Sequence, residues 1–338
     1  MNNASGRRWR CAVDFHAHLM IPEMYAITRA HSMFAKSMEV PGLNEQAKKG
    51  LADREKWLVN GMSDVTERIG NMDRMGIDVQ VLSSSLVHQC TYWAEPQVSL
   101  KLERKLNDRM TEIVQSNPKR FIGLGGVPLH APDLAVLELT RCMTELKLAG
   151  IGISTTAGDL ELGDEKLRKF WETAERLGAV VYIHPAGNHS PRFEKWHLWN
   201  SIGQTFEEAM AIASLFYEGV LDAFPNLKIC ISHGGGYMPY NMGRIIRNYL
   251  DKPTTRINMS KSPTEYLRML YYDTCVYETD VLETLVKRVG AERVLLGSDY
   301  PVGENKPIEF IEASSLSQDD KQKIIGLNAA KLFGVTVA

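Results

Sequence analysis

Short apolar runs rich in β-branched residues alternate along the chain with longer stretches in which apolar residues recur every three or four positions. The short runs predict strands buried on both faces, and the longer stretches predict amphipathic helices that cover a parallel sheet. The strand-like runs are Ala12–His18, Val79–Ser83, Phe121–Val127, Gly150–Ser154, Ala179–His184, Leu227–His233, Leu270–Thr274 and Val294–Asp299. The clearest helical stretches are Ser63–Met75, Pro96–Asn117, Ala131–Leu148, Asp164–Leu177 and Phe206–Phe224.

Eight such units predict a (β/α)8 barrel, the TIM-barrel fold. A doubly wound α/β fold would show the same alternation, but it would need a Gly-x-Gly-x-x-Gly turn after the first strand, which this sequence lacks. The intervals 19–62 and 185–205 are too long for simple crossovers, and such insertions usually lie over the mouth of a barrel. We therefore expect one domain over residues 1–338, with a flexible tail at 1–10 and a lid formed by the insertion 19–62 after the first strand.

Composition narrows the classes of function. The 338 residues are 44% hydrophobic and 24% charged, with a formal net charge of −2, and no basic stripe with interleaved aromatics suggests a nucleic-acid partner. No apolar run approaches the length of a membrane span or a signal peptide. The five cysteines are widely spaced, which is typical of reduced thiols in a cytoplasmic protein. We expect a cytoplasmic protein with a small-molecule ligand.

The pair His16-Ala17-His18 ends the first predicted strand. Side chains two positions apart point to the same side of a strand, so both imidazoles can bind one metal ion. Taken alone, this spacing is explained equally well by chance. The other strand ends change that balance.

His184 ends the fifth predicted strand, His233 the sixth and Asp299 the eighth. Because the carboxyl ends of barrel strands converge on one face, these residues are expected to meet His16 and His18 there. Singly, each histidine could be a core residue and Asp299 could cap a following helix, but their shared position at strand ends favours a metal site. Three imidazoles and a carboxylate suit zinc, with manganese or iron as alternatives. The fourth strand ends without a lysine that could bridge two ions, so one divalent metal per chain is expected.

Longer motifs surround these residues. They are Asp14–His18 (DFHAH), Tyr92–Pro96 (YWAEP), Pro118–Gly125 (PKRFIGLG), Ile183–Pro185 (IHP), Ser232–Gly236 (SHGGG), Gly297–Pro301 (GSDYP) and Asn328–Ala330 (NAA). With them the chain, from about Val13 to Gly334, resembles the metal-dependent amidohydrolase superfamily. It is most similar to the branch that contains 2-amino-3-carboxymuconate-6-semialdehyde decarboxylase.

The resemblance implies that His16, His18, His184 and Asp299 bind zinc with a water molecule, and that His233 acts beside that water as acid and base. Asp299 could also take part in proton transfer through the carboxylate oxygen that does not bind the metal. In this branch one arginine from the insertion after the first strand and one from the neighbouring subunit hold substrate carboxylates.

The substrate-binding candidates follow from that comparison. Arg54 is the candidate for the first arginine, and Lys252 stands where the second is expected, which implies a homodimer. Trp196 or Trp199 matches the tryptophan region that borders substrate in the family. Trp93 could stack on a planar substrate.

The sequence therefore predicts a metal-dependent, non-oxidative decarboxylase of a small unsaturated or hydroxyaromatic carboxylic acid. The same five site residues would also serve a hydrolase of a lactone or amide, or a hydratase of an unsaturated diacid, because fold and metal ligands do not fix the reaction. A non-catalytic binding barrel is the third alternative, and it would leave the polar strand ends without a chemical purpose.

Overall fold

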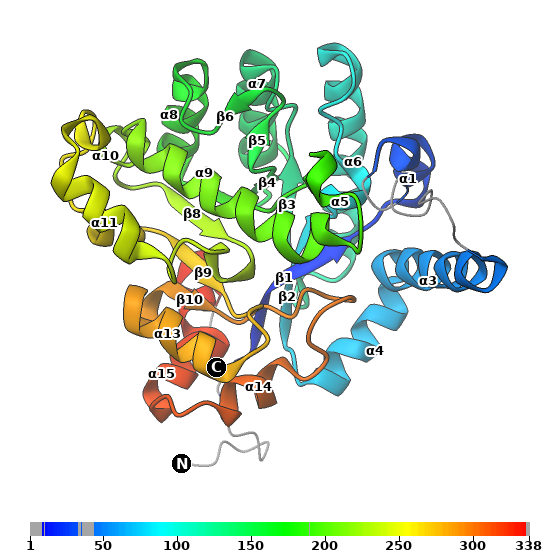
Figure 1. Ribbon diagram of the computed structural model, residues 1–338. Coiled ribbons are helices and arrows are strands. Elements are labelled where there is room, and N and C mark those ends of the chain that lie inside the picture. Colours follow the sequence, from blue (N-terminus) through cyan, green and yellow to red (C-terminus); the bar gives the residue numbers. More distant parts are fainter. Residues whose placement is uncertain (1–8, 10, 33–34, 36–43, 189, 336–338) are drawn as a thin grey trace.

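Eight parallel strands form one sheet in the order β1-β2-β3-β4-β7-β8-β9-β10. The structure is a computed structural model that describes residues 9, 11–32, 35, 44–188 and 190–335. The strands are β1 (Val13–Leu19), β2 (Val79–Ser84), β3 (Phe121–Gly126), β4 (Gly150–Ile153), β7 (Val180–Ile183), β8 (Lys228–Ile231), β9 (Tyr271–Asp273) and β10 (Val294–Leu295). The last strand returns to the first, because Phe15 N donates to Leu296 O over 2.8 Å and Ala17 forms a parallel bridge with Tyr300. The predicted (β/α)8 barrel is confirmed (Figure 1).

Helices surround the strands on the outside (Figure 1). They are α1 (Pro22–Thr28), α3 (Glu45–Ser63), α4 (Val65–Met75), α5 (Leu86–Gln89), α6 (Pro96–Ser116), α7 (Pro132–Thr144), α8 (Arg168–Leu177), α9 (Thr205–Tyr217), α10 (Val220–Ala223), α11 (Met242–Asp251), α12 (Pro263–Leu267), α13 (Thr279–Val289), α14 (Pro307–Ala313), α15 (Gln318–Gln322) and α16 (Asn328–Phe333). A short antiparallel pair, β5 (Thr156–Ala157) and β6 (Leu160–Glu161), lies apart from the barrel sheet.

The strands are buried on both faces, as their near-continuous apolar runs require. One cluster fills the barrel interior with side chains from different strands, among them Phe15, Val81 and Tyr182. A larger cluster lies between the strands and the surrounding helices. The strands are therefore fixed from both sides, which makes their carboxyl ends rigid positions for functional side chains.

The eight predicted strands all appear at their expected places, with ends that differ by a few residues. The largest difference is at β10, which ends at Leu295, because the next backbone N–H, of Leu296, donates to Ile324 O instead of continuing a ladder. The predicted helix 206–224 is divided into α9 and α10 at Gly219, whose φ of +69° is readily available only to glycine. The predicted helix 131–148 ends at Thr144.

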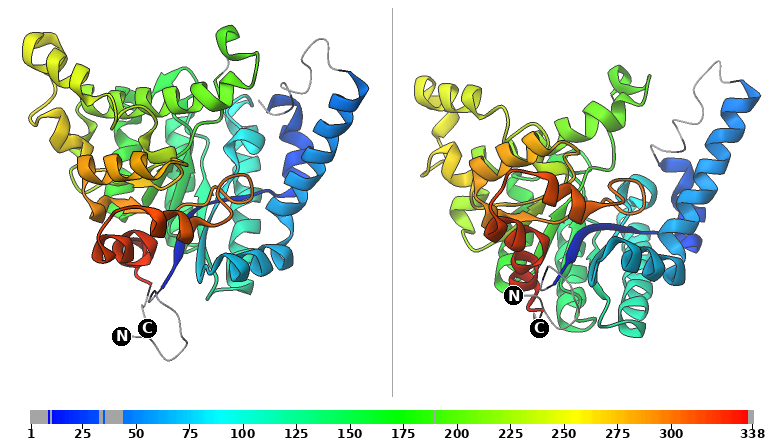
Figure 2. Two further views of the ribbon diagram at one scale, coloured as in Figure 1. Left: turned by 60° about the horizontal axis from the view of Figure 1, so that its bottom comes forward. Right: turned by 90° about the horizontal axis from the view of Figure 1, so that it is seen from below.

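The insertion 19–62 forms α1, a short 3-10 turn (Arg29–His31) and most of α3, while its residues 33–34 and 36–43 lie outside the described part. Asn44 begins α3 by accepting a hydrogen bond from Ala47 N. Figure 2 shows α1 and α3 together at one side of the barrel. Leu58 and Met62 of α3 pack in a cluster with Trp199 of the second insertion, so the two insertions meet over the mouth. The tail at 1–10 lies outside the described residues except for Trp9.

No helix in the described part of the chain is both long enough and apolar enough to cross a membrane. All five cysteines lie in that part, and no two of them form a disulfide.

A buried acid between α6 and β3 makes the stability of the barrel depend on pH. Glu103 accepts a hydrogen bond from Thr91, and burial raises the pKa of its carboxyl to about 7. A carboxyl whose pKa is higher in the folded than in the unfolded chain favours the protonated folded state, so it opposes folding increasingly as pH rises from about 4.5 toward 7. We therefore expect the free energy of unfolding of Glu103→Gln, relative to that of wild type, to increase by up to about 3 kcal/mol from pH 5 to pH 8. Urea denaturation at both pH values measures this difference.

Glu112→Gln, on the exposed side of the same helix, is the matched control, since its side chain is paired with Arg109 at the surface. Its stability difference from wild type should stay within about 0.5 kcal/mol at both pH values. If the stability of both variants relative to wild type changed equally between pH 5 and pH 8, ionisation of Glu103 would not destabilise the folded state.

Candidate metal centre and substrate cavity

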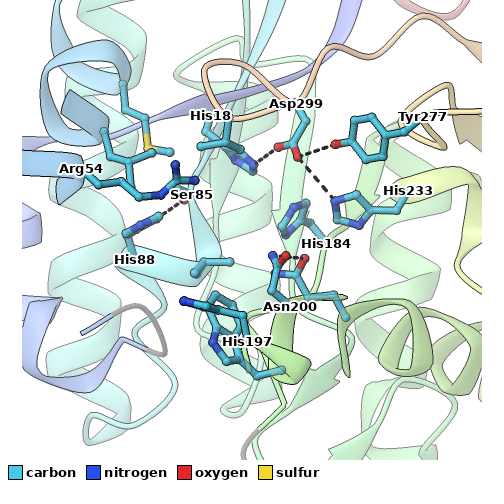
Figure 3. Close-up of a pocket in the computed structure, with 16 residues that line it drawn as sticks. His18, Arg54, Ser85, His88, His184, His197, Asn200, His233, Tyr277 and Asp299 are labelled. Atoms are coloured by element: carbon cyan, nitrogen blue, oxygen red, sulfur yellow. Dashed lines mark hydrogen bonds and ion pairs between the residues drawn. The ribbon is translucent and has the colours of Figure 1, made fainter. Parts of the chain in front are cut away.

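Five polar residues predicted at strand ends come together at one mouth of the barrel, where Figure 3 shows His18, His184, His233 and Asp299, and His16 contacts both His18 and Asp299. His16 and His18 lie on β1, and His184 and His233 follow β7 and β8 by one and two residues. Asp299 lies four residues beyond the end of β10. Neighbouring imidazole rings are 5.0 Å apart between His16 and His18, 4.8 Å between His18 and His184, and 5.0 Å between His184 and His233.

The tightest part of this cluster has the spacing of atoms that share a metal ion. Nε2 of His16 and Nε2 of His18 are 3.3 Å apart, and Asp299 Oδ1 lies 3.2 Å from the first and 2.9 Å from the second. Atoms held about 2.1 Å from one zinc ion lie roughly 3.0–3.4 Å from each other. His16, His184, His233 and Asp299 also offer ligand atoms within 4.8 Å of one another. The residues present therefore fit a single divalent cation.

Backbone and carboxylate groups behind the cluster orient its histidines. His16 Nδ1 lies 2.7 Å from Asp273 Oδ2, at the end of β9, and Asp273 Oδ1 accepts backbone hydrogen bonds from Gly234 and Cys275. His184 Nδ1 lies 2.9 Å from the carbonyl oxygen of Pro185. Each contact engages Nδ1 and leaves Nε2 directed toward the centre, as is usual for metal-binding histidines.

The charges of the cluster strongly shift its pKa values. Burial alone would lower the pKa of His16, but the carboxylates of Asp299 and Asp273 outweigh it and raise the pKa to about 9. Burial, with further lowering by neighbouring imidazoles, takes the pKa of His184 well below its usual range. Burial opposes ionisation of Asp299, yet His16 and the other imidazoles hold its pKa well below normal. The negative potential of the carboxylates at His16 is what a cation at this position requires.

Two of the site residues, and one neighbour, have strained backbones. His233, Tyr277 and Asp299 have φ values of +46°, +59° and +57°, in the left-handed region that non-glycine residues rarely adopt. Such strain persists only where surrounding structure enforces it, and it concentrates at functional sites. The turned backbones bring the Tyr277 hydroxyl to 3.1 Å from Asp299 Oδ2, and His233 Nε2 to 3.9 Å from the same oxygen. The side chain of Asp299 therefore serves this cluster instead of capping a helix.

A cavity of about 350 Å³ opens above the cluster. His18, His184, His233 and Asp299 line it on one side, and Arg54 reaches in from α3 on the opposite side (Figure 3). The remaining lining combines apolar and polar side chains: Leu58, Met62, Ser85, Val87, His88, His197, Trp199, Asn200, Gln204, Tyr277 and Val302. The cavity thus has a candidate metal site at one wall and a cation at the other.

The expected substrate-binding residues divide into two groups. Arg54 lines the cavity, and so does Trp199, which is 5% exposed on a π-helical turn (Trp199–Gln204). Trp196 is 82% exposed and is not part of the lining. Trp93 donates to Cys90 O and borders a neighbouring pocket of about 320 Å³. Lys252 is exposed just after α11 and outside the cavity lining.

Sequence reasoning missed several residues of the site. Asp273 lay at the end of the seventh predicted strand, so the same strand-end argument could have found it. His88 and His197 also line the cavity. Tyr277 and Glu208 had no sequence signal, because one depends on a left-handed loop and the other projects inward from a helix.

Comparison with known proteins agrees with this architecture. The model of an amidohydrolase family matches residues 13–335. The chain is 37% identical over 280 residues to 2-amino-3-carboxymuconate-6-semialdehyde decarboxylase of Dictyostelium discoideum, covering 80% of this chain and 77% of that protein. Among solved structures, 5-carboxyvanillate decarboxylase from Sphingomonas paucimobilis superposes with a TM-score of 0.84 at 26% identity, covering 96% of this chain and 99% of the other.

A dihydroxybenzoic acid decarboxylase from Polaromonas sp. JS666, solved with manganese and the inhibitor 2-nitroresorcinol, has a TM-score of 0.82 at 26% identity, over 97% of this chain and 98% of that one. The match of the family model over nearly the whole chain, the eight-stranded barrel and the decarboxylase relatives agree with one another. The chain therefore belongs to the amidohydrolase family, and within it to the decarboxylases.

Proposed function

We propose that this enzyme is a metal-dependent, non-oxidative decarboxylase of a small carboxylic acid, with a hydroxyaromatic acid as the favoured substrate class. The observation that carries the proposal is the cavity itself, which has the candidate metal ligands and His233 on one wall and Arg54 on the other. A volume of about 350 Å³ suits a single substituted ring. Relatives that act on carboxyvanillate and dihydroxybenzoate support an aromatic substrate, whereas the amino-carboxymuconate relative supports an open-chain one.

His16, His18, His184 and Asp299 are the proposed ligands of one divalent metal per chain. Their three imidazoles and one carboxylate favour zinc, and manganese is the competing candidate because the Polaromonas relative contains it. A divalent ion bound there would polarise a substrate oxygen and stabilise the negative charge left when carbon dioxide departs.

The residues of the chain supply the remaining steps. Arg54 would hold an anionic group of the substrate, while Trp199 packs against its body. When the carbon–carboxyl bond breaks, the electron pair stays on carbon, and His233 Nε2 delivers the proton that forms the new C–H bond. Asp299 Oδ2, 3.9 Å from that nitrogen, helps to hold the imidazolium before transfer. Solvent then returns the proton to His233.

Arg54 is expected to affect substrate binding much more than chemistry. It extends from α3 into the cavity on the wall opposite His233 (Figure 3). We predict that Arg54→Gln raises KM about 10- to 100-fold with a change in kcat of less than about threefold, because a charge-assisted hydrogen bond to a carboxylate is worth roughly 1.5–3 kcal/mol. Steady-state kinetics on the best acid found would measure both constants.

Arg54→Lys is the informative companion variant, since lysine retains the positive charge but cannot form the bidentate hydrogen bonds of a guanidinium group with a carboxylate. It should recover part of the lost affinity. A wild-type KM in Arg54→Gln would move the carboxylate contact to another residue of the cavity.

We also propose that the enzyme is a cytoplasmic homodimer in which Lys252 approaches the neighbouring site. Leu250 and Ile257, on either side of Lys252, are strongly exposed apolar residues of the kind that an interface would cover. The absence of a disulfide among the five cysteines supports a reducing location. Light scattering would give the mass of the particle, and a monomer at assay concentration would exclude a role for Lys252 in a neighbouring site.

The proposed reaction is tested by incubating metal-analysed protein with hydroxybenzoic, carboxyvanillic and muconate-type acids and measuring carbon dioxide release. Release with about one zinc or manganese per chain is the expected result. Water addition or hydrolysis products in place of carbon dioxide would preserve the site and overturn the reaction in favour of a hydratase or hydrolase.

A further inference from the structure

Glu208 is a fully buried carboxylate that approaches His233 from helix α9. Its Oε1 lies 2.6 Å from His233 Nδ1 and also accepts a hydrogen bond from the Ser232 hydroxyl. Helix α9 otherwise covers the barrel with apolar side chains such as Ile212 and Leu215. Burying a carboxylate costs several kcal/mol unless it is paired, so its inward position requires a specific partner, and His233 is that partner.

The glycine-rich turn after β8 is shaped to admit this helix. Gly236 has a φ of +59°, and a Cβ at that position would lie 2.1 Å from Thr205 O and 3.0 Å from the Glu208 Cβ. Any other residue would push the beginning of α9 away. The Tyr237 backbone N–H, next in the turn, donates to Thr205 O over 3.3 Å. The turn that carries His233 is thus docked on the first turn of the helix that carries Glu208.

The two nitrogens of the His233 ring therefore face different surroundings. Nδ1 faces the Glu208 carboxylate, and Nε2 faces Asp299 and the cavity. The same arrangement occurs at His16, whose Nδ1 contacts Asp273 while Nε2 faces the cluster. A carboxylate that accepts a hydrogen bond from the Nδ1–H fixes the tautomer and the ring plane, so Nε2 is the nitrogen available for proton exchange with a bound molecule.

We propose that Glu208 is a positioning residue that holds the Nδ1 proton and the ring orientation of His233, so that Nε2 delivers protons into the cavity. The proposal rests on the proposed function only in assigning His233 as the acid and base. It applies equally whether that proton goes to a carbon that has lost carbon dioxide or to a leaving group in hydrolysis.

Removing the contact should slow proton delivery without weakening substrate binding. We expect Glu208→Ala to lower kcat about 10- to 100-fold, with KM and metal content within about twofold of wild type. Glu208→Gln should lose less, because its amide oxygen can still accept a hydrogen bond from the Nδ1–H. The solvent deuterium isotope effect on kcat should rise in both variants, since proton transfer then limits turnover. A purely structural role would leave that isotope effect unchanged.

Two neighbouring residues provide matched controls. Glu207→Gln changes the adjacent carboxylate of α9, which accepts hydrogen bonds from Asn188 and Thr155. Ser232→Ala removes the other donor to Glu208 and leaves the His233 pair in place. Both should keep kcat within about threefold. An equal loss in Ser232→Ala and Glu208→Ala would show that Glu208 acts through the turn, and would overturn the proposal.

A crystal structure of metal-loaded Glu208→Ala separates this proposal from the choice of reaction. The proposal expects the His233 ring to rotate or to occupy more than one orientation, so that Nε2 leaves its place near Asp299. An unmoved ring together with wild-type kcat on any substrate that the native enzyme turns over would refute it. Native protein that hydrolyses substrates without releasing carbon dioxide would overturn only the proposed reaction.

Discussion

Replacing His233 by alanine is expected to reduce kcat by about three orders of magnitude while the metal content stays at the wild-type value. The loss follows from the removal of a positioned proton donor, which typically contributes 10²–10⁴-fold to a rate. Retention of metal follows from the geometry. The atoms His16 Nε2, His18 Nε2 and Asp299 Oδ1 lie 2.9–3.3 Å from one another. His233 Nε2 is farther away, at 3.9 Å from Asp299 Oδ2. Parallel measurements of turnover and of metal per chain test both parts.

The outcome also decides between two roles for His233, since its position close to His16, His184 and Asp299 would allow it to bind the ion instead. Loss of metal and activity together would identify a ligand, and His18 would then be the residue outside the coordination sphere. Added imidazole should partly restore turnover in His233→Ala if a proton donor is what the variant lacks. His130→Ala serves as the control, because that ring contacts the Ala94 carbonyl and lies outside the cavity lining.

The strand ends were predictable from sequence because two constraints coincide there. A barrel strand must be apolar along its length, so a histidine or aspartate that ends such a run is conspicuous, and the fold brings every such end to one face. His184, directly after the apolar run of β7, is the clearest case. Asp299 was found by the same argument although β10 is only two residues long, since the chain beyond it still follows β1 through the hydrogen bonds between Tyr300 and both His16 and His18.

The residues around these ends were harder to predict because their positions depend on tertiary approach. Glu208 is one of two adjacent acids on an amphipathic helix, and nothing local shows that one is buried against His233 while the other faces Asn188. Trp196 and Trp199 are three residues apart, yet the π-helical turn buries Trp199 in the cavity lining and Trp196 remains exposed. Spacing in the sequence cannot separate such neighbours, since Trp196 precedes the π-helical turn in a left-handed conformation (φ +55°) whereas Trp199 begins that turn.

Removal of the metal is the second change with a large expected effect, and it should abolish turnover and lower thermal stability together. The ligand atoms offered by His16, His18 and Asp299 lie at the spacing of one ion and are almost completely buried, so a cation that binds only the folded chain must stabilise it. At a concentration 100 times its Kd, such an ion contributes about 2.7 kcal/mol to the free energy of unfolding. This contribution can be measured by calorimetry of chelator-treated protein before and after zinc or manganese is added. Carbon dioxide release from the same samples shows which metal restores activity.

Asp273→Asn provides a graded version of the same experiment. Asp273 lies 2.7 Å from His16 Nδ1 and has no place among the proposed ligands, so the variant should still bind one ion, but with about 10- to 100-fold weaker affinity. Its melting temperature should then rise at higher metal concentrations than that of wild type. At saturating metal, the total increase in melting temperature should approach the increase seen in wild type. Glu112→Gln, at the surface of α6, should follow the wild-type curve. Full turnover by chelator-treated protein that contains less than about 0.1 metal ion per chain would show that the reaction does not need the ion. The buried imidazoles and carboxylates would then have to act through proton transfer alone.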